Sequence, residues 1–346
     1  MNILVYGGCH AGVLRHVLAR HATGEHRVDM LVNFQLIRTN TPFPYERLPR
    51  YDWVIFSPVL NRDAWNTSHL EAACRTAGVK TLKFPWLQWG GYWPQVRKRT
   101  WGKNSEWGLP RLAELGRADM GFDAFYEHLF DPSAFGDGLG DWIDFTTTRL
   151  QANERNGEVD LPVSDWIAEH HAAAQLFLTP DHPSNHLYKH LVRRIADALG
   201  LRIEPGFYAS SLELQEGVRL PVLPAIQKAM GLSFSSAEWG HHEFLGSASY
   251  GLHEFAMSYH QASRVRLGLA LGNTALKAVD AMGAGPGAPG RQPVRKGTRM
   301  LMRMVDAPTF VAHDAVALLD NVNVDQPSLA PMYLFREHWS VSSPSL

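Results

Sequence analysis

The sequence predicts an α/β fold with a parallel-sheet core, many helices and a mostly helical C-terminal region. Short apolar runs typical of buried strands alternate with amphipathic helical patterns, and the first run ends in a glycine-rich turn that opens a helix. Beyond about residue 216 this alternation gives way to helical periodicity. We therefore expect an α/β core over 1–215 and a mainly helical region over 216–346.

Four strands are predicted in the first part of the core. Residues 2–6 form the first, and the turn Gly7-Gly8-Cys9-His10 leads from it into an amphipathic helix. The other strands are expected at 28–34, 53–56 and 79–84, with a helix near 68–76 before the last. Since helical connections join the strands, they should run parallel, with helices on both faces of the sheet.

The rest of the chain is less regular. Residues 86–104 are rich in Trp, Gly and Pro, which predicts a long functional loop. We expect helices over 111–129 and 140–155, a return to the sheet at 175–178, and then a strongly amphipathic helix closed by Gly200. Within 216–346 we expect a helix over 252–282, a flexible Gly/Pro linker over 283–290, and strands near 310–312 and 332–335.

Composition and charge exclude several classes of function. Lys and Arg number 33 against 34 Asp and Glu, so no global field attracts nucleic acid or an anionic membrane. Two cysteines make no disulfide framework, which favours a reducing, cytoplasmic setting. The sequence shows no signal peptide and no transmembrane run. It also lacks the HExxH and CxxC spacings of metal ligands, so we expect no metal site.

The first turn is the principal candidate for a functional site. In an open α/β sheet, ligands bind beyond the carboxyl ends of the strands, where Cys9 and His10 stand. The glycines Gly7 and Gly8 permit a sharp turn, and the helix N-terminus that follows favours a thiolate and an oxyanion. The alternative is that Cys9 is a small residue that fits a crowded turn, and Cys74, in an Ala-rich helix, is expected in the core.

A second candidate is Thr179-Pro180-Asp181-His182-Pro183-Ser184, where a predicted strand meets a predicted helix. With Pro183 as the first helical residue, His182 would cap the helix and face the same crevice as a general base. Either Thr179 or Asp181 would orient its ring. The competing interpretation makes Asp181 and Ser184 ordinary helix-capping residues.

These two motifs resemble those of the WcbI family of polysaccharide-biosynthesis proteins. The layout is also similar to the SGNH or GDSL esterases, in which the nucleophile closes the first strand and the base begins a late helix, so the resemblance implies an SGNH/flavodoxin-like core. Cys9 would replace the serine, and His182 would match the histidine. The sequence departs from the pattern at Gly8, where esterases carry Asp, and at Thr179, where the acid would be.

The resemblance covers about residues 1–205 and implies that the core is catalytic: it would bind coenzyme A or acetyl-CoA and transfer an acetyl group to a sugar hydroxyl of a capsule or similar glycan precursor. Ser57 and Asn61, after the third strand, are candidates for a further oxyanion donor. The loop over 86–104 contains aromatic rings that could stack on an adenine or a sugar, and basic residues that could pair with phosphates. The alternative for the basic residues is that they are simply solvated. The basic residues are Arg97, Lys98, Arg99 and Lys103.

Three other functions compete. A carbohydrate esterase would use the same site with water as the acceptor. A nucleotide-binding protein is disfavoured because the turn reads GGxxxG and the second strand ends at Asn33 rather than at an acid. A noncatalytic glycan-binding protein would use the Trp-rich loop as its platform.

Overall fold

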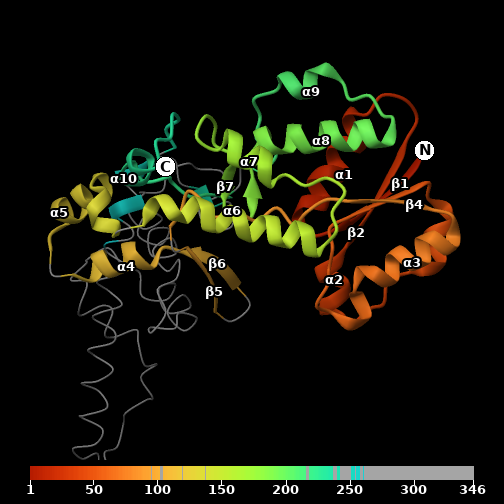
Figure 1. The fold of residues 1–346 in the computed structure, drawn as a ribbon, viewed down its shortest axis with the longest axis horizontal. Helices are drawn as coiled ribbons and strands as arrows, with labels where there is room; N and C mark the ends of the chain where they lie inside the picture. The colour runs from red at the N-terminus through yellow and green to blue at the C-terminus, as the bar shows by residue number, and fades with distance from the viewer. Residues whose placement is uncertain are drawn as a thin grey trace, which may run out of the picture. The chain divides into compact units, whose positions relative to one another are not determined.

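The computed structural model describes residues 1–94, 96–101, 104–118, 120–136, 138–215, 218–236, 240–241, 251–253, 255–257 and 260. These residues fall into two compact units. Unit 1 comprises Met1–Gly91, Gly140–Glu216 and Gly231–Phe234, and unit 2 comprises Tyr92–Leu139, Gly217–Met230 and Ser235–Leu346. Unit 1 carries the parallel sheet (Figure 1).

The predicted parallel sheet is confirmed. Its strands are β1 (Asn2–Gly7), β2 (Arg27–Val32), β3 (Trp53–Phe56) and β4 (Lys80–Lys83), in the order β2-β1-β3-β4 with every pair parallel. Strand β2 is shorter than expected, because Asn33 and Phe34 begin a helix. The connections between strands are α1 (Cys9–His21), then α2 (Asn33–Arg38) with the 3-10 helix η1 (Tyr45–Arg50), then η2 (Asp63–Trp65) with α3 (Thr67–Ala77).

The core of unit 1 forms on both faces of strand β1. Leu4 and Tyr6 point to one face and pack in a cluster with Leu70 and Cys74 of α3. Ile3 and Val5 alternate with them and are fully buried on the opposite face. Each such apolar side chain stabilises the fold by roughly 1.5–3 kcal/mol through burial. The strand that leads to the first turn is therefore held rigidly.

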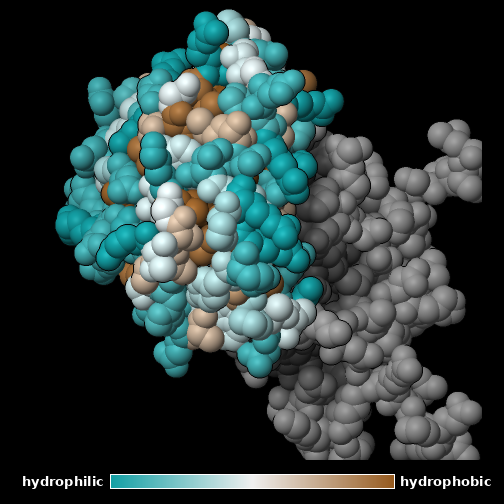
Figure 2. All heavy atoms as spheres, turned by 90° about the vertical axis from the view of Figure 1, so that its right-hand side faces the viewer, coloured by the Kyte–Doolittle hydropathy of each residue, from teal (hydrophilic) through white to brown (hydrophobic). Residues whose placement is uncertain are grey.

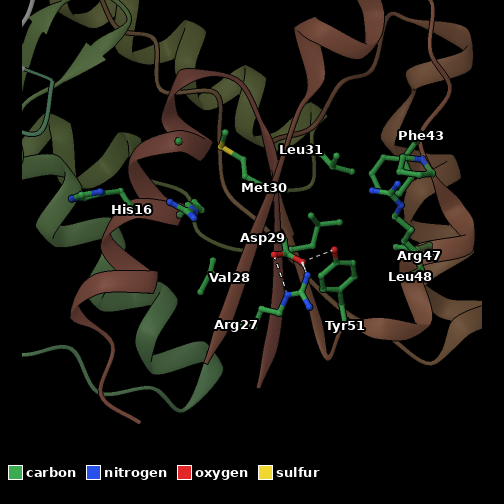
Figure 3. A pocket seen from close by; sticks show the side chains of 14 residues that line it. His16, Arg27, Val28, Asp29, Met30, Leu31, Phe43, Arg47, Leu48 and Tyr51 are labelled. Atoms are coloured by element: carbon green, nitrogen blue, oxygen red, sulfur yellow. Dashed lines mark hydrogen bonds and ion pairs between the residues drawn. The ribbon is translucent and has the colours of Figure 1, made fainter. Parts of the chain in front are cut away.

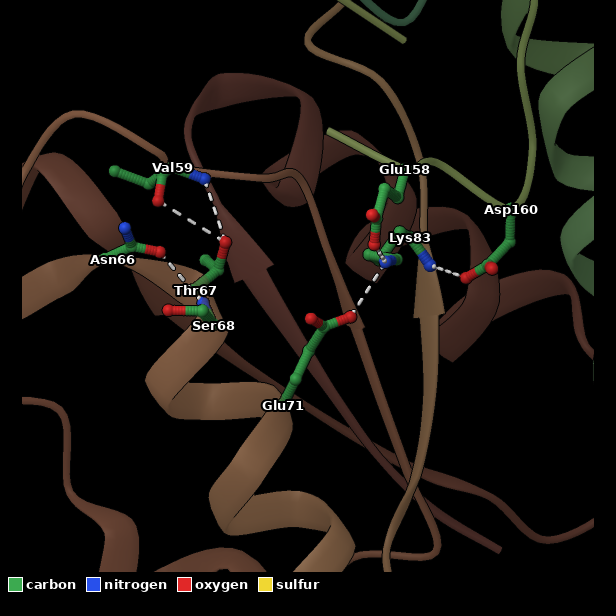
Figure 4. A network of polar contacts seen from close by, with 8 residues as sticks. All are labelled: Val59, Asn66, Thr67, Ser68, Glu71, Lys83, Glu158 and Asp160. Carbon is green, nitrogen blue, oxygen red and sulfur yellow. Dashed lines mark hydrogen bonds and ion pairs between the residues drawn. The ribbon is translucent and has the colours of Figure 1, made fainter. Parts of the chain in front are cut away.

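The edge of the sheet at β4 is covered by the segment after α6 (Leu139–Asn156). Asp160 Oδ2 accepts a hydrogen bond from Lys83 N at 2.6 Å, and Lys83 O accepts from the backbone N–H groups of Asp160 and Leu161 at 3.0 and 3.1 Å (Figure 4). The side chain of Lys83 pairs with Glu71 at 2.8 Å. The opposite edge strand, β2, has no such covering segment paired to it among the described residues.

The segment 175–184 differs from the prediction. Strand β7 (Phe177–Thr179) does not join the parallel sheet, because the chain turns back at once and β7 pairs antiparallel with β8 (His182–Pro183). Helix α8 (Asn185–Leu199) begins later than expected. Its N-cap is Ser184, whose Oγ accepts from His186 N at 3.3 Å, so His182 and Asp181 are not capping residues. Helix α7 (Ser164–His170) precedes the segment 175–184 in the chain, and α9 (Pro205–Ala209) follows α8.

Unit 2 corrects two further expectations. The predicted loop over 86–104 contains strand β5 (Arg97–Trp101), which forms a hairpin with β6 (Asn104–Gly108). The single helix expected over 111–129 is instead α4 (Pro110–Arg117) and α5 (Phe122–Glu127), followed by the 3-10 helices η3 (His128–Phe130) and η4 (Pro132–Phe135); the break has extended backbone at Ala118 and Gly121. In unit 1, the helix expected over 140–155 is confirmed as α6, whose first residue alone belongs to unit 2.

The remainder of unit 2 is described in part. It contains a short ladder of β9 (Val218–Arg219) and β10 (Gly240–His241), with α10 (Pro224–Ala229) between them in the chain. Of the helix expected over 252–282, residues 252–253, 255–257 and 260 are helical. The rest of that helix, the linker over 283–290 and the strands expected near 310–312 and 332–335 lie outside the described residues.

One face of the molecule is mainly hydrophilic, and its apolar residues form small separate patches (Figure 2). Within the described part of the chain, no helix is both long enough and apolar enough to cross a membrane.

Candidate functional site

The first turn places Cys9 at the N-terminus of α1, directly after the central strand β1. Its two glycines allow close packing: a Cβ on Gly8 would lie 2.9 Å from Cζ3 of Trp86, and one on Gly7 would lie 3.2 Å from Cβ of Ala11. Cys9 is exposed, whereas Cys74 is fully buried. Burial raises the pKa of Cys74 to about 11, with the charge of Glu71 adding to the shift. Cys74 is therefore a core residue, as predicted.

The environment of Cys9 suits a negatively charged sulfur. No side chain caps α1, and no acidic residue lies in its first turn. The partial positive charge of the helix N-terminus therefore acts on the thiol at the first helical position. This is the electrostatic arrangement that a nucleophilic thiolate requires.

His10 joins the two sequence motifs. Its Nε2 lies 2.8 Å from the backbone carbonyl of Asp181, which is 171 residues away in the sequence. Because a carbonyl can only accept, Nε2 carries the proton and Nδ1 is the basic nitrogen of the ring. The ring is 1% exposed and lies edge-on to Trp86, with centroids 4.8 Å apart. Residues 9–10 and 179–184 therefore belong to one site.

In the second motif the structure places Thr179 against Asp181. Thr179 is fully buried, and its Oγ1 donates to Oδ1 of Asp181 at 3.0 Å. The carbonyl of Pro180 accepts from Trp89 N at 2.8 Å, which fixes the backbone at this point. His182 is half-buried in β8, next in sequence to Asp181. Thr179 thus orients the carboxylate that neighbours His182.

Tyr188 of α8 also belongs to this site, although the sequence analysis did not identify it. Its side chain is fully buried, and its hydroxyl donates to Oε1 of Gln215 at 2.6 Å. Burial raises the pKa of Tyr188 well above its usual value, and the nearby charges of Cys9 and Asp181 add to this. The phenol is therefore neutral, and it lies within range of the charges of both residues. Its signal in the sequence is a single hydroxyl within the apolar stripe of α8.

The two candidates after β3 are separated by the structure. Ser57 is 2% exposed at the carboxyl end of β3, and its Oγ has no hydrogen-bond partner among the described residues. This unsatisfied hydroxyl agrees with a role as a donor to a ligand. Asn61 is exposed in the following loop, and no described contact brings it to Cys9.

The Trp-rich segment is mainly structural. Trp89, Tyr92 and Trp93 are at most 1% exposed, so the expectation that they stack on a ligand is wrong. Trp89 Nε1 donates to Thr147 Oγ1 at 3.0 Å inside unit 1, and Trp93 Nε1 donates to the Pro221 carbonyl at 3.0 Å inside unit 2. Trp86, at 36% exposure, is the ring of this group that reaches both solvent and the site.

The predicted phosphate-binding residues fall in unit 2, not in unit 1 with Cys9. Arg97, Lys98 and Arg99 lie in strand β5, and Lys103 is outside the described residues. Among the described residues, no group of His, Cys, Asp and Glu side chains is arranged to hold a metal ion.

Comparison with known proteins gives the family. A family model described as polysaccharide biosynthesis enzyme WcbI matches residues 2–204. The chain belongs to the WcbI family. The matched range contains both motifs of the candidate site, and residues 205–346 lie beyond it. The resemblance seen in the two motifs is therefore confirmed, and the family consists of polysaccharide-biosynthesis enzymes.

A solved structure supports the fold assignment. The chain is similar to a WcbI protein, described as a novel polysaccharide biosynthesis enzyme in its native form without a disulfide bond between coenzyme A and a cysteine. The TM-score is 0.57 at 18% identity, over 75% of this chain and 88% of the WcbI chain. At this identity the likeness shows the fold alone, and the SGNH-like layout stays a prediction. No curated protein matches the chain.

Proposed function

We propose that this WcbI-family protein transfers an acetyl group from acetyl-CoA to a sugar hydroxyl during capsule or surface polysaccharide biosynthesis. The observation that carries the proposal is the hydrogen bond from His10 to the carbonyl of Asp181. It brings an exposed thiol at a helix N-terminus to the same site as a histidine and a carboxylate, which together are the parts that acyl transfer needs.

In the covalent form of the mechanism, Cys9 is the nucleophile. Its thiolate attacks the thioester carbonyl of acetyl-CoA, the bond to the sulfur of coenzyme A breaks, and the departing thiolate takes up a proton from solvent. His182 then removes the proton of the sugar hydroxyl, whose oxygen attacks the acetyl-cysteine and releases the Cys9 thiolate. The imidazolium afterwards returns its proton to solvent. The N-terminal N–H groups of α1 and the Ser57 hydroxyl stabilise the negative oxygen formed in each step.

In the direct form, His182 or His10 deprotonates the sugar hydroxyl, which attacks acetyl-CoA without an acetyl-cysteine intermediate. His182 is the better placed of the two, since Nε2 of His10 is occupied by the Asp181 carbonyl and its ring is buried. Asp181, held by Thr179, precedes His182 in the sequence, and its negative charge favours the imidazolium that forms.

Two features support coenzyme A as the donor. The solved WcbI protein is described with reference to a disulfide between coenzyme A and a cysteine. Of the two cysteines in this chain, Cys9 is the exposed one, so it is the thiol that a bound coenzyme A can meet. A free thiol in this role requires a reducing compartment, which agrees with a cytoplasmic enzyme.

A carbohydrate esterase is the second candidate, and the exposure of Cys9 favours it because water reaches the thiol. The two activities are separated by two measurements: acetyl-CoA consumption with and without a sugar acceptor, and acetate release from an acetylated sugar. A transferase consumes acetyl-CoA faster when the acceptor is present and yields the acetylated sugar, whereas a carbohydrate esterase leaves acetyl-CoA intact and releases acetate from the acetylated sugar.

The decisive test compares Cys9→Ala with Cys74→Ala. We expect Cys9→Ala to abolish acetyl transfer while leaving the melting temperature nearly unchanged, because the side chain is exposed. Cys74→Ala removes a buried core side chain, so it should lower stability and leave transfer by the folded enzyme intact. Wild-type turnover by Cys9→Ala would exclude the covalent mechanism, and loss of transfer in both variants would indicate a folding defect.

A further inference from the structure

A cavity of about 620 Å³ lies along the edge strand β2. This volume is in the range of small-molecule sites, which are roughly 300–1,000 Å³. Its walls come from α1, from β2 and from residues 43–51, and they include none of the candidate site residues. Figure 3 shows the side chains that surround it, with Asp29 of β2 between Arg27 and Tyr51. This cavity is therefore a second possible ligand site within unit 1.

The charge of the lining is predominantly positive. It contains the three guanidinium groups of Arg15, Arg27 and Arg47, against the single carboxylate of Asp29. That carboxylate is already engaged: Arg27 Nε donates to Oδ1 at 3.2 Å, and Tyr51 OH donates to Oδ2 at 3.0 Å. The charge of Arg15 also acts on Asp29, but one carboxylate cannot balance three guanidinium groups, so the lining keeps an excess of positive charge.

The neighbourhood does not cancel this positive charge. Arg47 lies 3.8 Å from Glu46, but the Glu46 side chain is 74% exposed and the pair is weakened by solvent. His16 adds no charge near neutral pH, because burial, Arg20, His21 and Arg15 lower its pKa. Two guanidinium groups from two different elements thus remain available for an anion, and Arg binds phosphate oxygens in a bidentate manner.

The floor of the cavity is apolar. Leu4, Val28, Phe43 and Leu48 line it and are each at most 6% exposed, and the ring of Tyr51 stands beside them. These four side chains are already shielded from water, and the half-buried ring of Tyr51 is the aromatic surface that the cavity offers to a ligand. A ligand that joins phosphate groups to a flat, largely apolar ring would satisfy both parts of the wall.

We propose that this cavity binds a nucleoside diphosphate group, with Arg15 and Arg47 on the phosphates and the base beside the ring of Tyr51, above the buried side chain of Phe43. Two molecules supply this chemistry: coenzyme A through its adenosine diphosphate end, and a nucleotide-activated sugar. The cavity adjoins Gly12, one turn of α1 beyond Cys9, so either ligand would lie on the same helix as the thiol.

The test is calorimetric titration of the full chain with ADP, UDP, adenosine and coenzyme A. Arg15→Gln and Arg47→Gln should each weaken ADP or UDP binding by about tenfold or more, because each removes a charge-assisted contact to phosphate. The matched controls are Arg20→Gln, further along α1, and Arg50→Gln, at the end of η1, since both residues lie outside the lining. Adenosine lacks phosphate, so its binding should be equal in all variants.

The outcomes separate the two sources and the rival explanation. If Arg15→Gln and Arg47→Gln weaken coenzyme A together with ADP, the cavity holds the nucleotide end of coenzyme A. If they weaken ADP or UDP alone, it holds a nucleotide-activated sugar. The proposal is overturned if neither nucleotide binds at millimolar concentration, or if the double variant binds as the wild type does.

The proposal is also overturned if no nucleotide binds and sedimentation shows a dimer that the Met30→Lys substitution on β2 dissociates. That result would mean that the edge strand β2 pairs with a second copy of the protein. Failure of acetyl transfer is a separate result, since nucleotide titration does not depend on Cys9.

Discussion

The role proposed for His182 depends on the residues before it in the chain. Thr179 holds Asp181, and the Pro180 carbonyl ties the turn to Trp89, so the imidazole is carried on a fixed backbone. Proton abstraction needs the neutral ring, and the unperturbed pKa of histidine is about 6.5. The rate of transfer should therefore fall as the pH drops below the pKa of this group.

The corresponding substitution is His182→Gln. It should lower kcat by roughly 10²–10⁴ and leave coenzyme A affinity similar, because a general base contributes about that much to the rate. His186→Gln is the control, since this histidine is exposed on α8. Full kcat in His182→Gln would remove this residue from the mechanism. Asp181→Asn and Thr179→Val, made separately, would show which side chain supports the ring.

His190 makes a different contribution, to stability. It stacks on Trp166 with centroids 4.4 Å apart, and its Nε2 has no hydrogen-bond partner among the described residues. Burial lowers the pKa of His190 from 6.5 to about 4, and the charges of Arg194, His170 and Arg193 add to this. The folded protein therefore resists protonation at a pH where the unfolded chain accepts the proton.

The stability of the protein should consequently fall as the pH drops from 6.5 to about 4. The urea midpoint of the wild type, followed across this window, should decrease more steeply than that of His190→Gln, which carries no titrating group at this position. His186→Gln should keep the wild-type slope because its side chain is solvated. Equal slopes in the wild type and His190→Gln would show that other groups dominate.

At the scale of secondary-structure elements, the start of α8 depends on one serine. Ser184 Oγ accepts from His186 N at 3.3 Å and donates to the Gln175 carbonyl at 2.6 Å, so it joins the helix to the residues before β7. Ser184→Ala should destabilise the protein by about 1–2 kcal/mol, measured by chemical unfolding. The control, Ser68→Ala in the first turn of α3, has an exposed side chain and should change stability by less than about 0.5 kcal/mol.

The elements that the sequence predicted well are those with a strong local pattern. Strands β1, β3 and β4 and helices α3, α6 and α8 have clear apolar periodicity, and each was expected within a few residues of its actual bounds. Pairing was harder to predict. Strand β7 is apolar enough for the parallel sheet, but its partner is determined by the immediate reversal of the chain at Pro180 and Asp181. The β5–β6 hairpin could not be predicted, because the charged and aromatic residues of its strands show no alternation of apolar and polar positions.

At the scale of the whole molecule, ligand binding should be visible as stabilisation. A ligand that binds only the folded state adds about 2.7 kcal/mol at a hundredfold excess over its Kd. Coenzyme A or acetyl-CoA should therefore raise the melting temperature. NAD shares only the adenosine diphosphate group with coenzyme A, and the first turn lacks the GxGxxG pattern, so NAD should raise the melting temperature no more than ADP does. A shift with NAD and none with coenzyme A would contradict the proposed acyl transfer.

The site was only partly predictable from sequence. Position in the chain was enough to suggest Cys9 and His182, because strand ends and helix starts can be inferred from local pattern. The contact of His10 with Asp181 depends on how distant segments pack, and so does the burial of Tyr188. The aromatic segment could not be assigned from its residue types, because Trp and Tyr occur both in cores and in ligand sites, and only their burial distinguishes the two uses.

The bond between His10 and residue 181 is made to the main chain, which has a mechanical consequence. A substitution of the side chain at position 181 leaves the carbonyl in place and so preserves this hydrogen bond. The charge of the side chain before His182 can therefore change while His10 stays bound to residue 181. Conversely, a displacement of residues 179–184 would break this hydrogen bond and so remove a contact that holds the imidazole of His10 beside Trp86.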